Sequence, residues 1–207
     1  GKPLALKGVN RHESHPTFGA ATSEQVMLAD IQNLKTLGGN FIRGAHYPQA
    51  QRFLDLCDEM GFVVWDEGFD KWNDLSGRRP DQNLEEYVSR NMSALVRRDR
   101  NHPCVVAWSI GNEIPPANEK FPEGMTRARC AQFREVVRRD DVTRPVAAGC
   151  DHTGYFEAAN DALEPLDLIG WNYSRKYARG RKRYPDKPVV CSESASAFSS
   201  YGYYGAL

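Results

Sequence analysis

Residues 105–113 read VVAWSIGNE, a short apolar run that ends at a carboxylate, Glu113. Residues 188–194 repeat the arrangement as PVVCSES, in which Glu193 follows the apolar residues. Short runs rich in valine and other apolar residues predict strands that are buried on both faces of a parallel sheet. A buried strand that delivers a carboxylate at its C-terminal end is typical of the active site of a (β/α) barrel.

Five other runs have the same character, so the chain is expected to contain seven strands. We place them at residues 4–9, 41–45, 62–66, 105–110, 146–149, 168–172 and 189–192. Apolar residues at helical spacing lie between the runs and predict connecting helices. The first helix has a possible capping box at Thr22 and Gln25 and a stop at Gly38, the second stops at Gly61, and the third has to end before Pro103. Weaker helices are expected near 158–163 and 175–184.

This alternation of strands and helices predicts one α/β domain over residues 1–207. A doubly wound open sheet is the competing architecture. The barrel is preferred because polar residues follow many different strands, and a barrel gathers all its strand ends around one pocket. A complete barrel has eight strands, whereas the count here stops at seven. We therefore predict a (β/α)8 TIM barrel truncated after its seventh strand, with exposed edges unless an oligomer or flanking domains close it.

The composition is that of a neutral globular chain. It has 27 basic and 27 acidic side chains, which leaves no broad field for nucleic acid or anionic lipid. The basic stretch at 175–183 is interpreted as a solvated connection, and no apolar run approaches the roughly 20 residues that span a bilayer. The five cysteines are widely spaced, which argues against a disulfide framework or zinc knuckle. Both the cytoplasm and the periplasm of a bacterium remain open as the compartment.

Two strand-end carboxylates are what hydrolysis of a glycosidic bond requires. One protonates the leaving oxygen and the other attacks the sugar or activates water. A nucleophilic carboxylate has to be anionic and needs cationic or hydroxyl donors nearby, whereas the acid needs a drier or more anionic setting. The plainer alternative for Glu113 or Glu193 is a structural ion pair. If both act together, the fourth and seventh strands must meet at one rim.

The chain resembles the catalytic TIM barrel domain of glycoside hydrolase family 2, and within it the β-galactosidase branch. The resemblance runs in order over nearly the whole chain. The matching stretches are GVNRHESHP at 8–16, IRGAHYP at 42–48, CDEMG at 57–61, WDE at 65–67, RDRNHP at 98–103, WSIGNE at 108–113 and SE at 192–193.

The resemblance implies a glycoside hydrolase acting on a carbohydrate substrate. It would be a retaining exo-β-glycosidase that hydrolyses terminal β-D-galactosides, with Glu113 as general acid/base and Glu193 as nucleophile. Alternatives are a β-glucuronidase or another β-glycosidase of the family. A different class is a carbohydrate-binding remnant of such a barrel that retains the carboxylates but has no turnover.

The resemblance also implies a set of residues around the sugar. Arg43 and Tyr173 would lie beside Glu193, and Asn112 would bond the sugar 2-hydroxyl. Two histidines would contact other hydroxyls, and tryptophan rings, including Trp65, would face the sugar. The residues expected to bind substrate are Asn112, His12, His46, Arg43, Tyr173, Trp171 and Asp66. Asp151 and His152 are weaker candidates.

β-Galactosidases of this family often bind magnesium through an acidic residue and a histidine after the third strand, together with the acid/base glutamate. The corresponding segment at 66–72 reads DEGFDKW. Asp70 offers an oxygen ligand, but Trp72 stands where a histidine would help. Lys71 also makes a divalent cation less favourable. We therefore expect no metal and no other cofactor, although Asp70 leaves magnesium possible.

Overall fold

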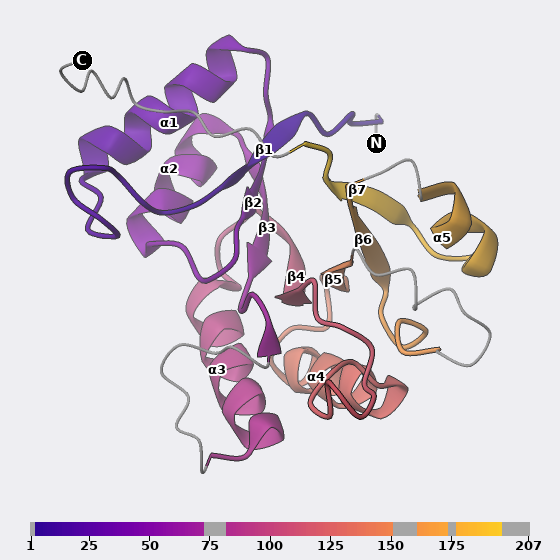
Figure 1. Ribbon diagram of the computed structural model, residues 1–207. Helices are drawn as coiled ribbons and strands as arrows, with labels where there is room; N and C mark the ends of the chain where they lie inside the picture. Colours follow the sequence, from indigo (N-terminus) through magenta and orange to yellow (C-terminus); the bar gives the residue numbers. More distant parts are fainter. Residues whose placement is uncertain (1–2, 73–81, 151–160, 174–176, 196–207) are drawn as a thin grey trace, which may run out of the picture.

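The computed structural model describes residues 3–72, 82–150, 161–173 and 177–195, and shows seven strands in one sheet (Figure 1). The strands follow the sequence order, and every neighbouring pair is parallel. They are β1 (Gly8–Arg11), β2 (Phe41–Gly44), β3 (Val63–Glu67), β4 (Val105–Asn112), β5 (Val146–Cys150), β6 (Leu168–Asn172) and β7 (Val189–Glu193). The sheet curls until its edge strands β1 and β7 approach each other. The predicted TIM barrel that stops after seven strands is thereby confirmed.

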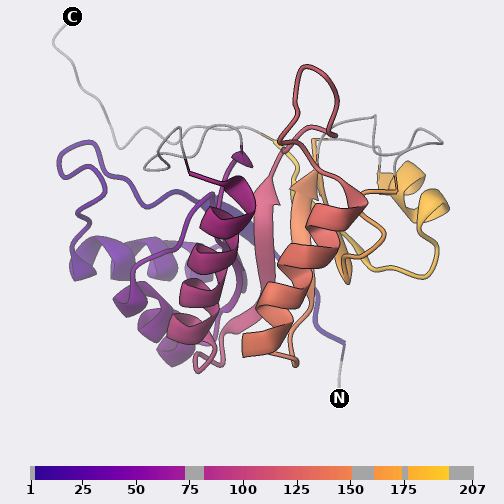
Figure 2. The same ribbon diagram turned by 90° about the horizontal axis from the view of Figure 1, so that it is seen from below.

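Helices cover the outer face of this sheet (Figure 2). They are α1 (Glu24–Thr36), α2 (Gln51–Met60), α3 (Leu84–Asp99), α4 (Arg127–Asp140) and α5 (Tyr177–Arg183). Helix α1 is capped by Ser23, whose side chain accepts the Val26 amide, so it begins one residue later than the capping box predicted. Gly38 and Gly61 adopt φ of 79° and 75° and end α1 and α2 as expected. Of the expected helix near 158–163, residues 158–160 lie outside the described residues and residues 161–163 are not helical.

Strand β1 lies further along the chain than the predicted run at 4–9. Leu4 and Leu6 are 62% and 46% exposed, so apolarity there does not mark a buried strand. Gly8 pairs with Phe41 so closely that a Cβ on Gly8 would lie 1.8 Å from the Phe41 carbonyl oxygen. The strand therefore begins where glycine permits close pairing with β2, a requirement that the hydrophobic pattern does not reveal.

Side-chain alternation along the strands separates two apolar clusters. The larger packs between the sheet and the helices and includes Trp108 and Trp171. The smaller fills the barrel interior with Phe41, Trp65, Ala107 and Ala147, contributed by β2 to β5. A residue's position along its strand thus decides whether its side chain points into the barrel or toward the helices.

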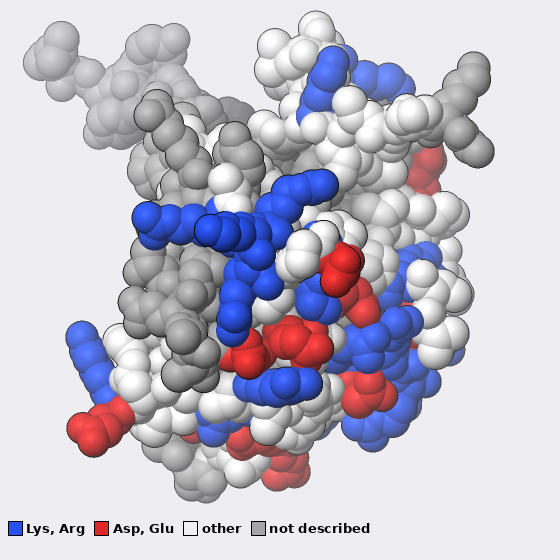
Figure 3. Space-filling model, turned by 90° about the vertical axis from the view of Figure 1, so that its right-hand side faces the viewer, with Lys and Arg blue, Asp and Glu red and all other residues white. Residues whose placement is uncertain are grey.

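The charged surface near α5 is mixed in sign. Basic residues end this helix at Arg181, Lys182 and Arg183, and Arg183 pairs with Asp161. Figure 3, which views the side of the molecule that carries α5, shows acidic side chains close to the basic ones. Among the described helices, none has the length and apolarity needed to cross a membrane.

Candidate active site

The carboxyl ends of the strands lie at one end of the barrel (Figure 2). An arginine from β2 links several of these strand ends. Arg43 on β2 is fully buried, and its Nη1 lies 2.7 Å from Oε1 of Glu193 at the end of β7. Its Nη2 donates to Oδ1 of Asn112 on β4 at 2.8 Å. Three strands are therefore tied together by one guanidinium, and Glu193 faces a fixed positive charge.

Glu67, at the end of β3, is the second carboxylate on this arginine. Its Oε2 lies 2.8 Å from Arg43 Nη2 and accepts the Ser109 hydroxyl at 2.6 Å, and neither Arg43 nor Glu67 is exposed. Burial opposes both charges, but the pair lowers the pKa of Glu67 and raises that of Arg43. Of the adjacent acids Asp66 and Glu67, the prediction named Asp66 as the site residue. The alternation of side chains along β3 could have identified Glu67, because Trp65 and Glu67 share one face of the strand.

Glu67 also orients a histidine at the rim. His46 Nδ1 lies 2.7 Å from Glu67 Oε1, so the N–H at this nitrogen donates a hydrogen bond to the carboxylate. The other ring nitrogen, Nε2, lies 3.5 Å from Asn112 Nδ2 and 3.7 Å from Glu193 Oε1. His12 is exposed, and its ring packs edge-on against His46 with centroids 5.1 Å apart. Partial burial and His46 lower the pKa of His12.

Glu113 joins the same network through two amides. Its Oε1 accepts from Asn172 Nδ2 at 3.1 Å, and the same nitrogen donates to Asn112 Oδ1 at 2.9 Å. Because Asn112 Oδ1 also accepts from Arg43, hydrogen bonds lead continuously from Glu113 to Glu193. The structure thus brings together the two glutamates, Arg43, Asn112 and His46 as the sequence predicted, and adds Asn172.

Two residues at the rim adopt left-handed backbone conformations. Glu113 has φ 49° and Tyr173 has φ 43°, and each directly follows a strand. The Glu113 amide donates to the Gly149 carbonyl at 2.8 Å, and the Tyr173 amide donates to the Glu193 carbonyl at 2.6 Å. Strained non-glycine residues of this kind cluster at functional sites. Tyr173 therefore contacts Glu193 through its backbone. Tyr173 is 40% exposed.

A glycine on β5 leaves room for the guanidinium. A Cβ on Gly149 would lie 2.5 Å from Arg43 Nη2 and 2.9 Å from Asn112 Oδ1. Contacts this short do not occur in folded proteins, so any larger residue would displace the arginine. Gly149 was not predicted as a site residue, because its role is to be small at a point where other strands send side chains.

Asp66 and Trp171 are corrections to the predicted site. Asp66 is fully buried on the face of β3 opposite to Glu67, and neither oxygen accepts a hydrogen bond from a described group. Burial and the neighbouring Asp99 raise the pKa of Asp66 well above its ordinary value. Trp171 is fully buried in the cluster under the helices, and Trp65 is 1% exposed inside the barrel. Neither tryptophan offers a ring face to a sugar. Asp151 and His152 lie outside the described residues.

A cavity of about 520 Å³ opens beside the network. His46 and Asp70 form part of its wall, and Asp70 Oδ1 accepts from Asn112 Nδ2 at 3.0 Å. The rest of the wall is partly aromatic, with Tyr47, Phe69 and Tyr87. Neither Glu113 nor Glu193 lines this cavity, so it adjoins the two carboxylates without containing them.

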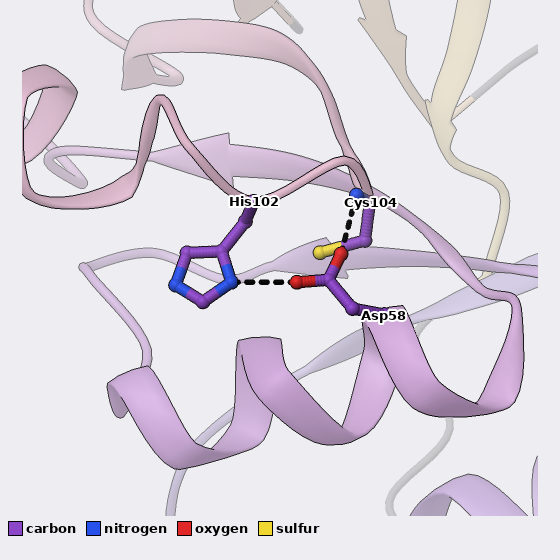
Figure 4. Close-up of side chains that lie close together, drawn as sticks. All are labelled: Asp58, His102 and Cys104. Carbon is purple, nitrogen blue, oxygen red and sulfur yellow. Dashed lines mark hydrogen bonds and ion pairs between the residues drawn. The ribbon is translucent and has the colours of Figure 1, made fainter.

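A separate trio of potential ligands, Asp58, His102 and Cys104, lies at the opposite end of the barrel, where β4 begins (Figure 4). Asp58 already uses both oxygens, one on His102 Nδ1 at 2.7 Å and one on the Cys104 amide at 2.6 Å. Burial raises the pKa of the Cys104 thiol, whereas metal binding needs the thiolate. We interpret the trio as a structural hydrogen-bonded link between α2 and the start of β4.

Comparison with known proteins gives consistent matches. The family model described as "Glycosyl hydrolases family 2, TIM barrel domain" matches residues 1–203. The β-galactosidase BoGH2A of Bacteroides ovatus is 33% identical over 99% of this chain, which spans 27% of that protein. The crystal structure of a glycosyl hydrolase family 2 member from Bacteroides cellulosilyticus aligns with TM-score 0.79 and 35% identity, over 94% of this chain and 25% of that one. The β-D-glucuronidase of Dictyoglomus thermophilum aligns with TM-score 0.78 and 25% identity, over 98% and 38%.

Proposed function

The chain belongs to glycosyl hydrolase family 2, and on that premise we propose that it is the catalytic barrel of a retaining exo-β-glycosidase that hydrolyses terminal β-D-galactosides. The curated relative from Bacteroides ovatus, at 33% identity, is named a β-galactosidase, whereas the β-glucuronidase structure shares 25%. This difference favours the galactoside. Closure of the gap between β1 and β7 falls, in this proposal, to segments outside the described sheet.

The observation that carries the proposal is the ion pair between Arg43 and Glu193 at 2.7 Å. A carboxylate nucleophile has to be anionic before it attacks, and a buried guanidinium keeps a compensating charge in place. Glu113 accepts from the neutral amide of Asn172 through Oε1, and its other oxygen lies 3.5 Å from the ammonium of Lys71, which is partly exposed rather than buried. Two carboxylates in different electrostatic settings are what an acid and a nucleophile require.

The reaction then proceeds in two displacements. Glu193 attacks the anomeric carbon while Glu113 donates a proton to the glycosidic oxygen, and the alcohol leaves. This step forms a covalent glycosyl-enzyme ester on Glu193. Glu113, now a base, takes a proton from water as the water attacks the same carbon. The ester bond to Glu193 breaks, and the sugar is released with its original anomeric configuration.

The neighbouring polar groups position the sugar in this scheme. Asn112 faces the 2-hydroxyl, where hydrogen bonds strengthen in the transition state. His46 bonds Glu67 through Nδ1, and this bond directs its Nε2, which lies 3.5 Å from Asn112 Nδ2, toward a sugar hydroxyl. His12, packed against His46, lies close enough to contact a second hydroxyl.

A panel of aryl β-glycosides assayed with the full-length protein tests the proposal. We expect turnover of the aryl β-galactoside with retention by NMR, and a loss on the order of 10⁴-fold or more in Glu193→Gln. Glu59→Gln, on the exposed face of α2, is the matched control and should keep full activity. Preference for the glucuronide would favour the alternative substrate. Sugar binding without any turnover would identify a non-catalytic remnant.

A further inference from the structure

A lysine ammonium lies between two carboxylates at the rim of the site. Lys71 Nζ is 3.0 Å from Oδ1 of Asp70 and 3.5 Å from Oε2 of Glu113. Asp70 follows β3 and Glu113 follows β4, so the ammonium bridges two neighbouring strand ends. Asp70 Oδ1 is held in turn by Asn112 Nδ2 at 3.0 Å. The bridge is therefore part of the network that contains both glutamates.

β-Galactosidases of the family often bind magnesium through an acidic residue and a histidine after the third strand, together with the acid/base glutamate, and here Asp70 and Glu113 are the acids that could take these roles. The residues present do not fit that ion. Magnesium requires oxygen ligands at about 2.0–2.1 Å in an octahedral shell, whereas a cationic Lys71 already occupies the space between the two carboxylates. A dication at the same place would meet a like charge only a few ångströms away.

Trp72 removes the remaining ligand. Its side chain is fully buried, its Nε1 donates to the Ile110 carbonyl at 2.8 Å, and its ring packs edge-on against Phe133 at 4.9 Å. An indole nitrogen that donates a proton has no lone pair for a metal. The segment after β3 thus supplies one acid, one cation and an apolar wall.

We propose that Lys71 is a positioning residue that takes the place of a divalent cation, bridging Asp70 to Glu113 and holding Glu113 at the mouth of the barrel. The assignment of Glu113 as the group that is positioned rests on the proposed function. A point charge with three rotating donors suits two carboxylates at about 3 Å, since an ammonium needs no fixed coordination geometry.

The charges around Lys71 sustain the bridge. Its side chain is 37% exposed, and partial burial works against its charge. Contacts with Asp70 and Glu113 outweigh this and raise the pKa of Lys71. The hydrogen bonds from Asn112 and Lys71 lower the pKa of Asp70 against the effect of burial. Lys71 and Asp70 are therefore both ionised at neutral pH.

Manganese binding to the full-length protein, followed by electron paramagnetic resonance, tests the substitution of metal by ammonium. We expect the wild type to have no Mn²⁺ site that depends on Asp70, so that wild type and Asp70→Asn bind the same amount of Mn²⁺. Lys71→Met should gain one weak Mn²⁺ site, held by the Asp70 and Glu113 carboxylates without a third side-chain ligand, and the double variant with Asp70→Asn should lose it. Lys71→Arg, which keeps a cation, should resemble the wild type. An Asp70-dependent Mn²⁺ site in the wild type, or no gain in Lys71→Met, would overturn the proposal.

Kinetics of the same variants test the positioning role. Lys71→Met should lower kcat on the order of 10–100-fold with a smaller change in KM, and Lys71→Arg should recover part of it. Lys120→Met, which removes an exposed lysine from Phe121, is the matched control and should be unchanged. An unchanged kcat in Lys71→Met would also sink the idea. Because Mn²⁺ binding needs no turnover, it remains readable if the galactosidase proposal itself fails.

Discussion

Arg43 and Glu193 are 150 positions apart in the chain, yet Arg43 Nη1 lies 2.7 Å from Glu193 Oε1. The contact crosses the barrel interior from β2 to β7, two strands that are not neighbours in the sheet. Arg43 also binds Glu67 on β3 and Asn112 on β4. These contacts form only when the sheet is curved enough to bring the strands around one guanidinium. Stability and chemistry should therefore depend on the same side chain.

Removing that guanidinium should harm the fold as well as the reaction. Arg43→Met leaves Glu67 and Glu193 buried without their partner, which should lower the free energy of unfolding by about 3–5 kcal/mol. Urea unfolding measures this loss. Arg52→Met is the control: Arg52 also pairs with Glu24 and Glu59, but its side chain is 40% exposed, so solvent screens these pairs and a far smaller loss is expected. Equal losses in the two variants would contradict the assignment.

Substitution of the two neighbouring acids on β3, Asp66 and Glu67, should affect activity differently. Glu67→Gln removes the charge that holds Arg43 and the acceptor that orients His46, so kcat/KM should fall on the order of 10–100-fold. Asp66→Asn changes the opposite face of the strand and should leave kcat/KM nearly unchanged. The ¹⁵N shifts of His46 should also change in Glu67→Gln only. Comparable activity losses in the two variants would disprove the division of faces.

Asp66 should make stability depend on pH. Because its pKa is raised from the ordinary 3.8, the folded state binds more protons than the unfolded state above that value. The free energy of unfolding should therefore fall as pH rises from about 4 toward the folded pKa, and this fall should be absent in Asp66→Asn. Unfolding in urea at several pH values measures the difference. A constant offset between the two proteins would refute the prediction, and Asp55→Asn on the exposed face of α2 serves as control.

The loss of rate on removing Glu113 should be larger for leaving groups that need protonation than for those that do not. In Glu113→Ala, aglycones with basic oxygens should lose about 10²–10⁴-fold in the bond-breaking step, whereas strongly acidic phenols should lose far less. The measurement is the rate of glycosyl-enzyme formation across a series of aryl β-galactosides. A loss of the same size for every leaving group would show that Glu113 is not the acid.

Much of the barrel is predictable because its signals are local. The ends of β2 to β7 lie within two residues of the predicted runs, and Gly38 and Gly61 end their helices as expected. The first strand was expected, but its predicted bounds were wrong because its position depends on close pairing between Gly8 and Phe41. The meeting of Arg43 with Glu193 was expected from the resemblance to the family, and the fold supplies the distance.

The candidate site was harder to predict where the two faces of a strand compete. Asp66 and Glu67 are adjacent acids, and their order alone does not say which one enters the barrel. Trp171 follows the same logic, since it lies on the helix-facing side of β6. Lys71 was expected to disfavour a metal, but its contact with Glu113 depends on how β3 and β4 end side by side.

Hydrophobic period, glycine stops and strand-end acids are properties of neighbouring residues, so the amino-acid order was enough to establish a parallel barrel with Glu113 and Glu193 at strand ends. Which side chains converge depends on the curl of the sheet and on the register between strands. Those are set by packing among segments far apart in the chain. The burial of Asp66, the space above Gly149 and the ammonium between Asp70 and Glu113 therefore emerged only once the barrel had formed.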